Sequence, residues 1–139
     1  MSQENVDVVR AGVEAFNRGD LDAAFKDAAP NFEWDNSRSM NADTRGVFTL
    51  DEILKVFKRA LELWESASIE IDEVIPVGDC VVLPHAVHFR GRDGIEAQAR
   101  TTWVFRIRNG RMERGCLYQD RQEALEAVGL LEQDAHADS

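Results

Sequence analysis

Hydrophobic positions near the start of the chain recur every three or four residues, which is the period of an α-helix. The apolar stripe consists of Val6, Val9, Val13 and Phe16. Gly19 favours the left-handed conformation that ends a helix, and Asp20 can cap a second helix. Pro30 prevents that second helix from continuing, so we expect a short strand over residues 31–35.

A polar segment with one glycine, residues 36–49, separates this strand from a third predicted helix. Segments of this length often form lids or rims of sites, so we expect a loop over one end of the domain. Thr49 or Asp51 can cap the third helix, which extends to about Ser66. Its apolar face comprises Ile53, Leu54, Phe57, Leu61 and Trp64.

The hydrophobic period then changes from that of a helix to two, which is the period of a β-strand. The expected strands cover residues 69–74, 80–89, 95–107 and 112–119. Turns are expected at Gly78-Asp79, at 91–94 and at Asn109-Gly110, the last being a strong hairpin signal. Asp120 and Glu123 have the spacing of a capping box for a short last helix that we expect to stop at Gly129.

Helices followed by a long antiparallel meander predict an α+β fold, in which a curved sheet wraps against helices. No linker or repeat divides the chain, so we expect one domain over residues 1–131 and a disordered polar tail over 132–139. Strand 95–107 alternates between two sets of side chains, Ala97, Ala99, Trp103, Phe105 and Ile107 on one face and Gln98, Arg100, Thr102 and Val104 on the other. Because apolar residues occur on both faces, we expect a homodimer through the outer sheet face.

The formal net charge of −10 argues against a nucleic-acid partner and against anionic membrane surfaces. The first residues, MSQENVDVVR, lack the pattern of a signal peptide, and no apolar run approaches the roughly 18 residues of a membrane span. Cys80 and Cys116 have no CxxC spacing, so we expect buried free thiols in a reducing cytoplasm. The sequence has no CxxC, HExxH, phosphate-binding glycine loop or GxSxG motif, so we expect no metal or cofactor.

Three segments of the chain carry a resemblance to a known family: VEAFNRGDLDAAF followed by NFEWD, the hairpin FRIRNGRM, and the ending LYQDRQEALEAVGL. Together, and in this order, they resemble the SnoaL-like branch of the NTF2-like superfamily, which includes polyketide cyclases and ketosteroid isomerases. The resemblance implies a cone in which a strongly curved, mixed and mainly antiparallel sheet wraps around N-terminal helices and encloses one internal pocket. Members include enzymes and domains without known activity, so the fold does not fix the function.

The known chemistries of this superfamily can be compared with the residues of this chain. The tyrosine of the steroid isomerases corresponds to Gly12, and their late aspartate corresponds to Thr102. An aspartate of the epoxide hydrolases corresponds to Leu117. The two-histidine pattern of scytalone dehydratase leaves room for one role at His85 or His88, without an evident aspartate partner. Most of the acids that these mechanisms need are therefore missing.

Four side chains remain as candidates for chemistry. Asp35, at the end of the first strand, is the candidate base. His85 and His88 are three residues apart on a strand and point to opposite faces, so only one of them can enter a pocket. We assign Arg100 to the cavity face, where it either pairs with Glu113 or orients a ligand carbonyl or carboxylate.

The residues expected to line the pocket combine aromatic and polar side chains. They are Trp34, Phe57, Trp64, Gln98, Thr102, Leu117 and Gln119. Trp34 is the foremost of these, because it leads directly into the polar loop. The sequence predicts a protein that binds a small, largely apolar molecule of polyketide, steroid or terpenoid type. The alternative is a cofactor-independent cyclase, isomerase, dehydratase or hydrolase that acts by general acid–base proton transfer.

Overall fold

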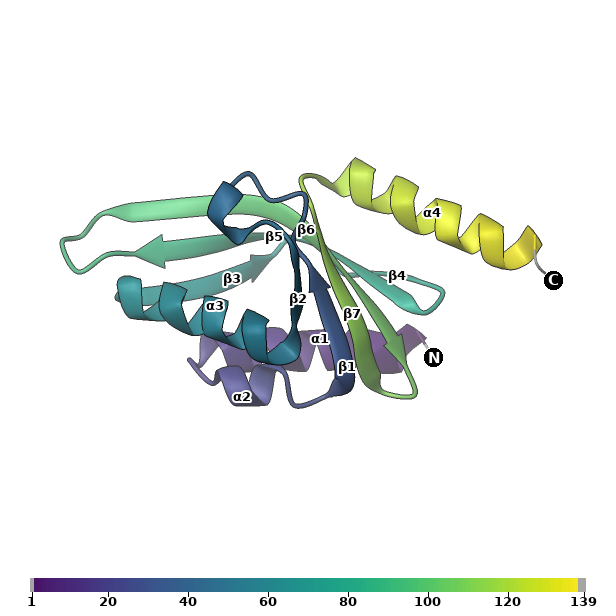
Figure 1. Cartoon of the computed structure of the whole chain (residues 1–139), viewed down its shortest axis with the longest axis horizontal. Coiled ribbons are helices and arrows are strands. Elements are labelled where there is room, and N and C mark those ends of the chain that lie inside the picture. The colour runs from purple at the N-terminus through teal and green to yellow at the C-terminus, as the bar shows by residue number, and fades with distance from the viewer. Residues whose placement is uncertain (1, 138–139) are drawn as a thin grey trace.

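The computed structural model describes residues 2–137 and shows an α+β fold (Figure 1). Its helices are α1 (Ser2–Asn17), α2 (Leu21–Ala24), η1 (Ala42–Thr44, a 3₁₀ turn), α3 (Leu50–Leu63) and α4 (Arg121–Ala137). Its strands are β1 (Ala28–Asp35), β2 (Val47–Thr49), β3 (Ser66–Ile71), β4 (Ile75–Val77), β5 (Cys80–Arg90), β6 (Glu96–Arg108) and β7 (Arg111–Tyr118). Among the described residues, no helix is long and apolar enough to cross a membrane.

The seven strands form one curved sheet in the order β2-β1-β7-β6-β5-β3, with β4 paired to β5. All neighbours are antiparallel except β1 and β7, which run parallel. Helices α1, α2 and α3 lie on one side of the sheet and α4 on the other (Figure 1). We call the side covered by α1–α3 the inner face and the side covered by α4 the outer face. The predicted fold class is confirmed.

The main core lies between the inner face and the first three helices, and it is rich in aromatic rings. Trp34 lies opposite Gly115 in the β1–β7 ladder. A Cβ atom at residue 115 would come within 2.5 Å of the indole ring, so only glycine leaves room for Trp34. The apolar stripe predicted for α1 is buried in this core, as expected.

The turn between α1 and α2 has the predicted chemistry, but α2 is shorter than expected. Gly19 has a φ of +81°, and the Asp20 carboxylate accepts a hydrogen bond from the Ala23 amide. The helix ends at Ala24, and β1 already begins at Ala28 and includes Pro30. Proline has no N–H for a ladder, and it lies where the register of β1 against β7 shifts, between Ala28 and Glu33.

The cap of α3 and the β6–β7 turn follow the sequence signals. Thr49 and Glu52 form a capping box, with each side chain accepting a hydrogen bond from the other residue's backbone amide. Asn109 and Gly110 have φ values of +52° and +74°, which is the backbone of a type I′ hairpin.

The predicted stop of the last helix at Gly129 is wrong, because α4 continues to Ala137. Asp120 accepts a hydrogen bond from the Glu123 amide, as its cap position predicts. Gly129 does not adopt a left-handed conformation, and a helix tolerates one such glycine at a cost of about 1 kcal/mol. Of the expected tail 132–139, residues 132–137 have a helical backbone, and 138–139 lie outside the described residues.

The two faces of β6 are the reverse of the sequence assignment. Trp103 and Phe105 point to the inner face and join the main core. Thr102 and Val104 are buried on the outer face, where Val104 packs in the cluster beneath α4. This second cluster contains Cys80, Val82, Val104, Tyr118, Ala124 and Val128. Part of the apolar outer face is therefore covered within the chain, by α4. Both cysteines are free thiols, of which Cys80 is buried and Cys116 half-buried.

Candidate functional site

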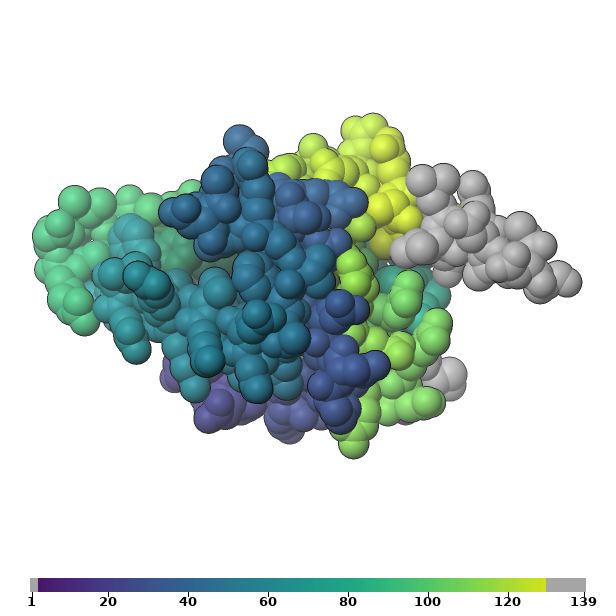
Figure 2. Space-filling model, in the orientation of Figure 1, coloured from purple at the N-terminus to yellow at the C-terminus, as the bar shows by residue number. Residues whose placement is uncertain are grey.

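A hollow of about 450 Å³ lies between α3, the segment 36–49 and the inner face of the sheet. In Figure 2 the blue and teal segment 36–49 and α3 cover the front of the molecule. The sheet contributes Val87, Phe89, Ala99, Arg100, Thr101, Trp103, Leu117 and Gln119 to the lining. Helix α3 contributes Ile53, Val56, Phe57, Ala60 and Leu61, and α1 contributes Phe16. The lining is completed by Trp34, Asn36, Ser39, Met40, Asn41 and Thr44.

Three aromatic rings form the floor of the hollow. The ring of Trp34 lies 5.4 Å from that of Trp103 and 5.9 Å from that of Phe57, both in edge-to-face packing. The indole N–H of Trp34 donates to the Asn36 side-chain oxygen at 3.0 Å. The glycine at 115 lets the indole lie flat on β7, so packing and a hydrogen bond together fix this ring.

Neutral polar groups form the rim of the hollow, mostly from the segment 36–49. The Asn36 amide nitrogen donates to the Thr44 carbonyl at 2.6 Å, and the Ser39 and Thr44 hydroxyls are 3.1 Å apart. Gln119 donates its amide nitrogen to the Arg38 carbonyl and thereby ties β7 to this segment. The rim is therefore held by hydrogen bonds within the segment and to Gln119, and none of the described residues that line it is a carboxylate.

His85 lies behind the wall of the hollow and does not line it. It is 1% exposed, and its ring stacks against Trp103 at 3.9 Å between centroids. Its Nδ1 is 2.8 Å from the Leu83 carbonyl oxygen, and its Nε2 is 3.3 Å from the Thr101 hydroxyl. Burial lowers the pKa of His85 to about 4, although the Leu83 carbonyl and the charge of Asp72 oppose that change.

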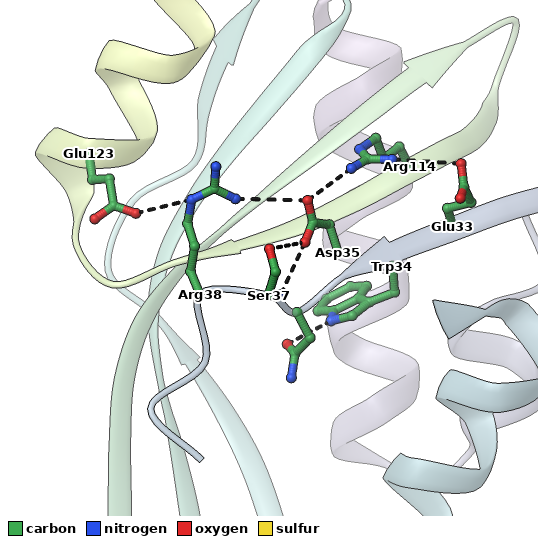
Figure 3. A network of polar contacts seen from close by, with 8 residues as sticks. Glu33, Trp34, Asp35, Ser37, Arg38, Arg114 and Glu123 are labelled. Atoms are coloured by element: carbon green, nitrogen blue, oxygen red, sulfur yellow. Dashed lines mark hydrogen bonds and ion pairs between the residues drawn. The ribbon is translucent and has the colours of Figure 1, made fainter. Parts of the chain in front are cut away.

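Asp35 points away from the hollow, on the opposite side of β1 from Trp34 (Figure 3). Its carboxylate accepts hydrogen bonds from the Ser37 amide and hydroxyl and from the Arg114 guanidinium at 2.9 Å. Arg38 lies 3.8 Å from the same carboxylate and 3.6 Å from Glu123. Burial raises the pKa of Asp35, but the Ser37 hydrogen bonds and the charges of Arg114 and Arg38 outweigh it and lower the pKa overall. The structure therefore places an ionised, fully paired aspartate outside the hollow.

Arg100 borders the hollow, but its charged group does not enter it. The guanidinium forms an ion pair with Asp72 at 2.6 Å and is 55% exposed. The predicted pair with Glu113 does not form, because the β6–β7 register places Glu113 near the other end of β6, 3.4 Å from Arg108. The sequence predicted Gln98, Arg100 and Thr102 on the cavity face of β6. This prediction is wrong, because the even-numbered residues of β6 point outward.

His88 and Trp64 also lie outside the hollow. His88 points outward beside Glu70, at 3.5 Å. Trp64 follows α3 and stacks on Phe89 at 5.2 Å, at the far end of the molecule near Gly91. Of the seven predicted pocket residues, Trp34, Phe57, Leu117 and Gln119 line the hollow.

Sequence reasoning missed the inner-face residues Val87, Ala99 and Thr101. A signal for two of them was present, because Ala99 and Thr101 share the period-two face of Trp103 and Phe105, the bulkiest apolar pair of the strand. Among the described residues, no group of three or more His, Cys, Asp or Glu side chains is arranged to hold a metal ion.

Comparison with solved structures shows the same fold in proteins of low sequence identity. AclR from Streptomyces galilaeus, a proposed hydroxylase, is 16% identical with a TM-score of 0.73, covering 93% of this chain and 98% of AclR. IdmH from Streptomyces antibioticus, a proposed polyketide cyclase, is 18% identical with a TM-score of 0.71, covering 90% and 98%. A protein from Catenulispora acidiphila with a ketosteroid isomerase-like fold, in complex with trimethylamine, is 14% identical with a TM-score of 0.68, covering 81% and 84%.

No curated protein matches the chain. The model of the SnoaL-like domain family matches residues 9–115, from the middle of α1 to Gly115 beneath Trp34. This match spans most of the chain and includes α2, α3 and the strands from β1 to the first part of β7, whereas α4 follows it. The chain belongs to the SnoaL-like domain family, with an NTF2-like fold.

Proposed function

We propose that the protein binds a small, flat and largely apolar molecule in the hollow. The observation that carries this proposal is the composition of the lining: an aromatic and aliphatic floor with a rim of amides and hydroxyls. Among the described residues that line it, none is an aspartate, glutamate, histidine or cysteine, and the Arg100 charge is engaged by Asp72. Such a surface favours binding of an uncharged ring system over acid–base chemistry.

The size of the hollow agrees with this proposal. Sites for small molecules usually enclose about 300–1,000 Å³ and combine an apolar lining with a few placed polar groups. The hollow has this size, and its polar groups are gathered at one end, in the segment 36–49 and at Gln119. A bound molecule would lie with its rings on Trp34, Phe57 and Trp103 and its polar substituents toward that end.

The alternative is a cofactor-independent enzyme that transfers a proton, as a cyclase, isomerase, dehydratase or hydrolase does. One observation favours it: the His85 imidazole is one hydroxyl away from the hollow, through Thr101. A general base works best with a pKa near the working pH, however, and burial lowers that of His85 to about 4. We therefore place binding first. Turnover of a bound ligand that is lost in His85→Phe but kept in His88→Gln would reverse this order.

A matched pair of variants tests the binding proposal. Ala99 lines the hollow, whereas Ala97, two residues earlier on the same strand, does not. Ala99→Trp should fill the hollow and weaken binding of 2-naphthol, measured by isothermal titration calorimetry, at least tenfold, while Ala97→Trp should leave it unchanged. Failure of the wild-type protein to bind any flat aromatic molecule, or equal binding by both variants, would contradict the proposal.

We also propose that two chains associate through the part of the outer face that α4 leaves uncovered. Ser68, His88 and Gln98 lie side by side there in the β3-β5-β6 ladder, and such a surface can pair with its own copy about a twofold axis. Sedimentation equilibrium tests this proposal, and Gln98→Glu, which places like charges across the axis, should weaken the dimer. A wild-type monomer at all concentrations would contradict it.

A reducing cytoplasm remains our proposal for the location. It is supported by the two free thiols, of which Cys80 is buried, since oxidising compartments favour disulfides.

A further inference from the structure

The wall of the hollow contains the Thr101 hydroxyl, whose proton is donated to a side chain outside the lining. Thr101 points to the inner face of β6 and lines the hollow, and its hydroxyl lies 3.3 Å from Nε2 of the buried His85. The two residues are paired across the β5–β6 ladder, so the backbone fixes their separation.

The Leu83 carbonyl determines which nitrogen of His85 carries the proton. A carbonyl oxygen can only accept a hydrogen bond, so Nδ1, at 2.8 Å from it, must be the donor. A neutral imidazole with its proton on Nδ1 has a lone pair on Nε2, and Thr101 must donate to it. The buried ring is held in its neutral form at neutral pH, because burial lowers its pKa to about 4.

A separate hydrogen bond fixes the orientation of the Gln119 amide. Its amide nitrogen donates one hydrogen to the Arg38 carbonyl, which leaves the side-chain oxygen as an acceptor and the second N–H as a donor. Tyr118 is paired with Thr102, so Gln119 comes next to Thr101 at the end of the β6–β7 ladder. Both residues line the hollow.

A third polar side chain of the lining, Asn36, is already engaged at both ends. Its oxygen accepts from the Trp34 indole, and its nitrogen donates to the Thr44 carbonyl. It therefore adds no strong preference, and the preference of this part of the wall for a donor or an acceptor is set by Thr101.

We propose that Thr101 forms a hydrogen-bond-acceptor subsite in the hollow, which takes a phenolic or enolic hydroxyl of the ligand and disfavours a carbonyl at that place. This inference rests on the proposed binding of a flat apolar molecule and names the group by which that molecule is oriented. A ligand O–H finds the lone pairs of the Thr101 oxygen, and Gln119 can either accept from the ligand or donate to it. A ligand carbonyl finds no free donor at Thr101, unless Thr101 gives up its bond to His85. His85 acts as a positioning residue, since it touches Thr101 and not the hollow.

Two probes of equal ring size test the subsite: 2-naphthol, which donates a hydrogen bond, and 2-naphthaldehyde, which only accepts. Thr101→Val removes the hydroxyl at nearly constant shape, and it should weaken 2-naphthol about two- to tenfold, the worth of one neutral hydrogen bond, without weakening 2-naphthaldehyde. Thr102→Val is the matched control, because Thr102 is the next residue of the same strand and is buried on the outer face. It should leave both affinities unchanged.

His85→Phe provides a readout that a purely structural role would not give. It keeps a ring against Trp103 but removes the acceptor, so the Thr101 hydroxyl becomes free to donate and 2-naphthaldehyde should bind about two- to tenfold more tightly. A thermal melt of each variant verifies that it is folded. Equal loss of both probes in this variant would overturn the positioning role.

The outcomes separate this inference from the proposed function. If the wild-type protein binds neither probe, the proposed function fails and the subsite fails with it. If both probes bind and Thr101→Val changes their ratio no more than Thr102→Val does, only the subsite is overturned. A measurement without ligand completes the test: ¹⁵N NMR of the His85 ring, assigned with His88→Gln and His136→Gln, should show the proton on Nδ1. A proton on Nε2 would overturn the inference.

Discussion

Trp34 and Gly115 show how one small residue shapes the floor of the hollow. The indole lies on the β7 backbone because residue 115 has no side chain, and a Cβ there would meet ring carbons at 2.5 and 2.7 Å. Real Cβ atoms do not approach that closely, so a larger residue must push the ring out of its place. The ring also contacts Phe57 and Trp103, and any displacement would pass directly into the hollow.

Gly115→Ala should therefore lower the free energy of unfolding by about 1–3 kcal/mol, the usual cost of overpacking a core. Gly129→Ala is the control, since the position is helical and no atom of the described residues, apart from its chain neighbours and its own helix backbone, lies within 4 Å of the added methyl group. It should raise stability by up to about 1 kcal/mol. Urea unfolding of the two variants measures both, and equal stability of Gly115→Ala and wild type would refute the packing argument.

Asp35 contributes stability that depends on its charge. Its pKa is lowered in the folded protein, so its contribution is complete above the ordinary value of 3.8 and is lost as the pH falls through the lowered folded value. Asp35→Asn should be less stable than wild type at pH 7, and the difference should shrink in strong acid. Urea unfolding as a function of pH measures it, with Asp43→Asn, at an exposed aspartate, as the control. A difference that is independent of pH would contradict this role.

His85 gives an acid sensitivity in a different pH window. The folded protein holds the ring neutral down to a pKa of about 4, whereas the unfolded chain takes up a proton near the ordinary value of 6.5. The wild-type protein should lose stability as the pH falls from about 6.5 to about 4, and His85→Phe should lose less over the same range. His88→Gln, which changes an outward-facing histidine, should follow wild type. Parallel pH profiles for wild type and His85→Phe would rule out a buried neutral imidazole.

At the scale of elements, α3 supplies the apolar wall that faces the sheet. Its capping box fixes where the helix begins, directly after the short strand β2. Thr49→Ala removes the oxygen that accepts from the Glu52 amide and should cost about 1 kcal/mol of stability. Thr49→Ser keeps that oxygen and should retain most of it. Equal losses in the two variants, measured by thermal unfolding, would show that the cap is not what matters.

The sequence predicted the elements better than the directions of their side chains. Caps and turns depend on residues close in sequence, and Asp20, Thr49 and Asn109-Gly110 all behave as local chemistry requires. The faces of β6 could not be settled locally, because both carry apolar residues. The outer set packs under α4, a partner that the strand itself does not reveal.

The candidate site likewise contains residues that the sequence could place and residues that it could not. Trp34 and Phe57 could be placed at the hollow because each belongs to an element with a clear apolar face. Thr101 could not, since its role depends on His85 of the neighbouring strand and on the Leu83 carbonyl behind it. The early end expected for α4 depended on a glycine signal and the late start expected for β1 on a proline signal, and neither residue ends or delays its element in the structure.

At the scale of the whole molecule, the sheet separates two kinds of surface. The inner face holds the aromatic floor and the hollow, whereas the charged groups of Asp35 and Arg100 are paired outside it and His88 points outward beside Glu70. Apart from Arg100, the described residues that line the hollow present carbon, amides and hydroxyls. This separation is the physical basis for placing binding ahead of catalysis.

Binding of a flat apolar molecule in the hollow is tested most directly by a ¹H–¹⁵N NMR titration of the wild-type protein with 2-naphthol. Binding in the hollow should produce saturable shifts for the amides of Val87, Ala99, Thr101 and Leu117, which surround it. Amides of the outer face, such as that of Val104 beneath α4, should stay in place. Shifts confined to the outer face or to the exposed end near Leu63 and Ile95, or no saturable shifts at all, would contradict it.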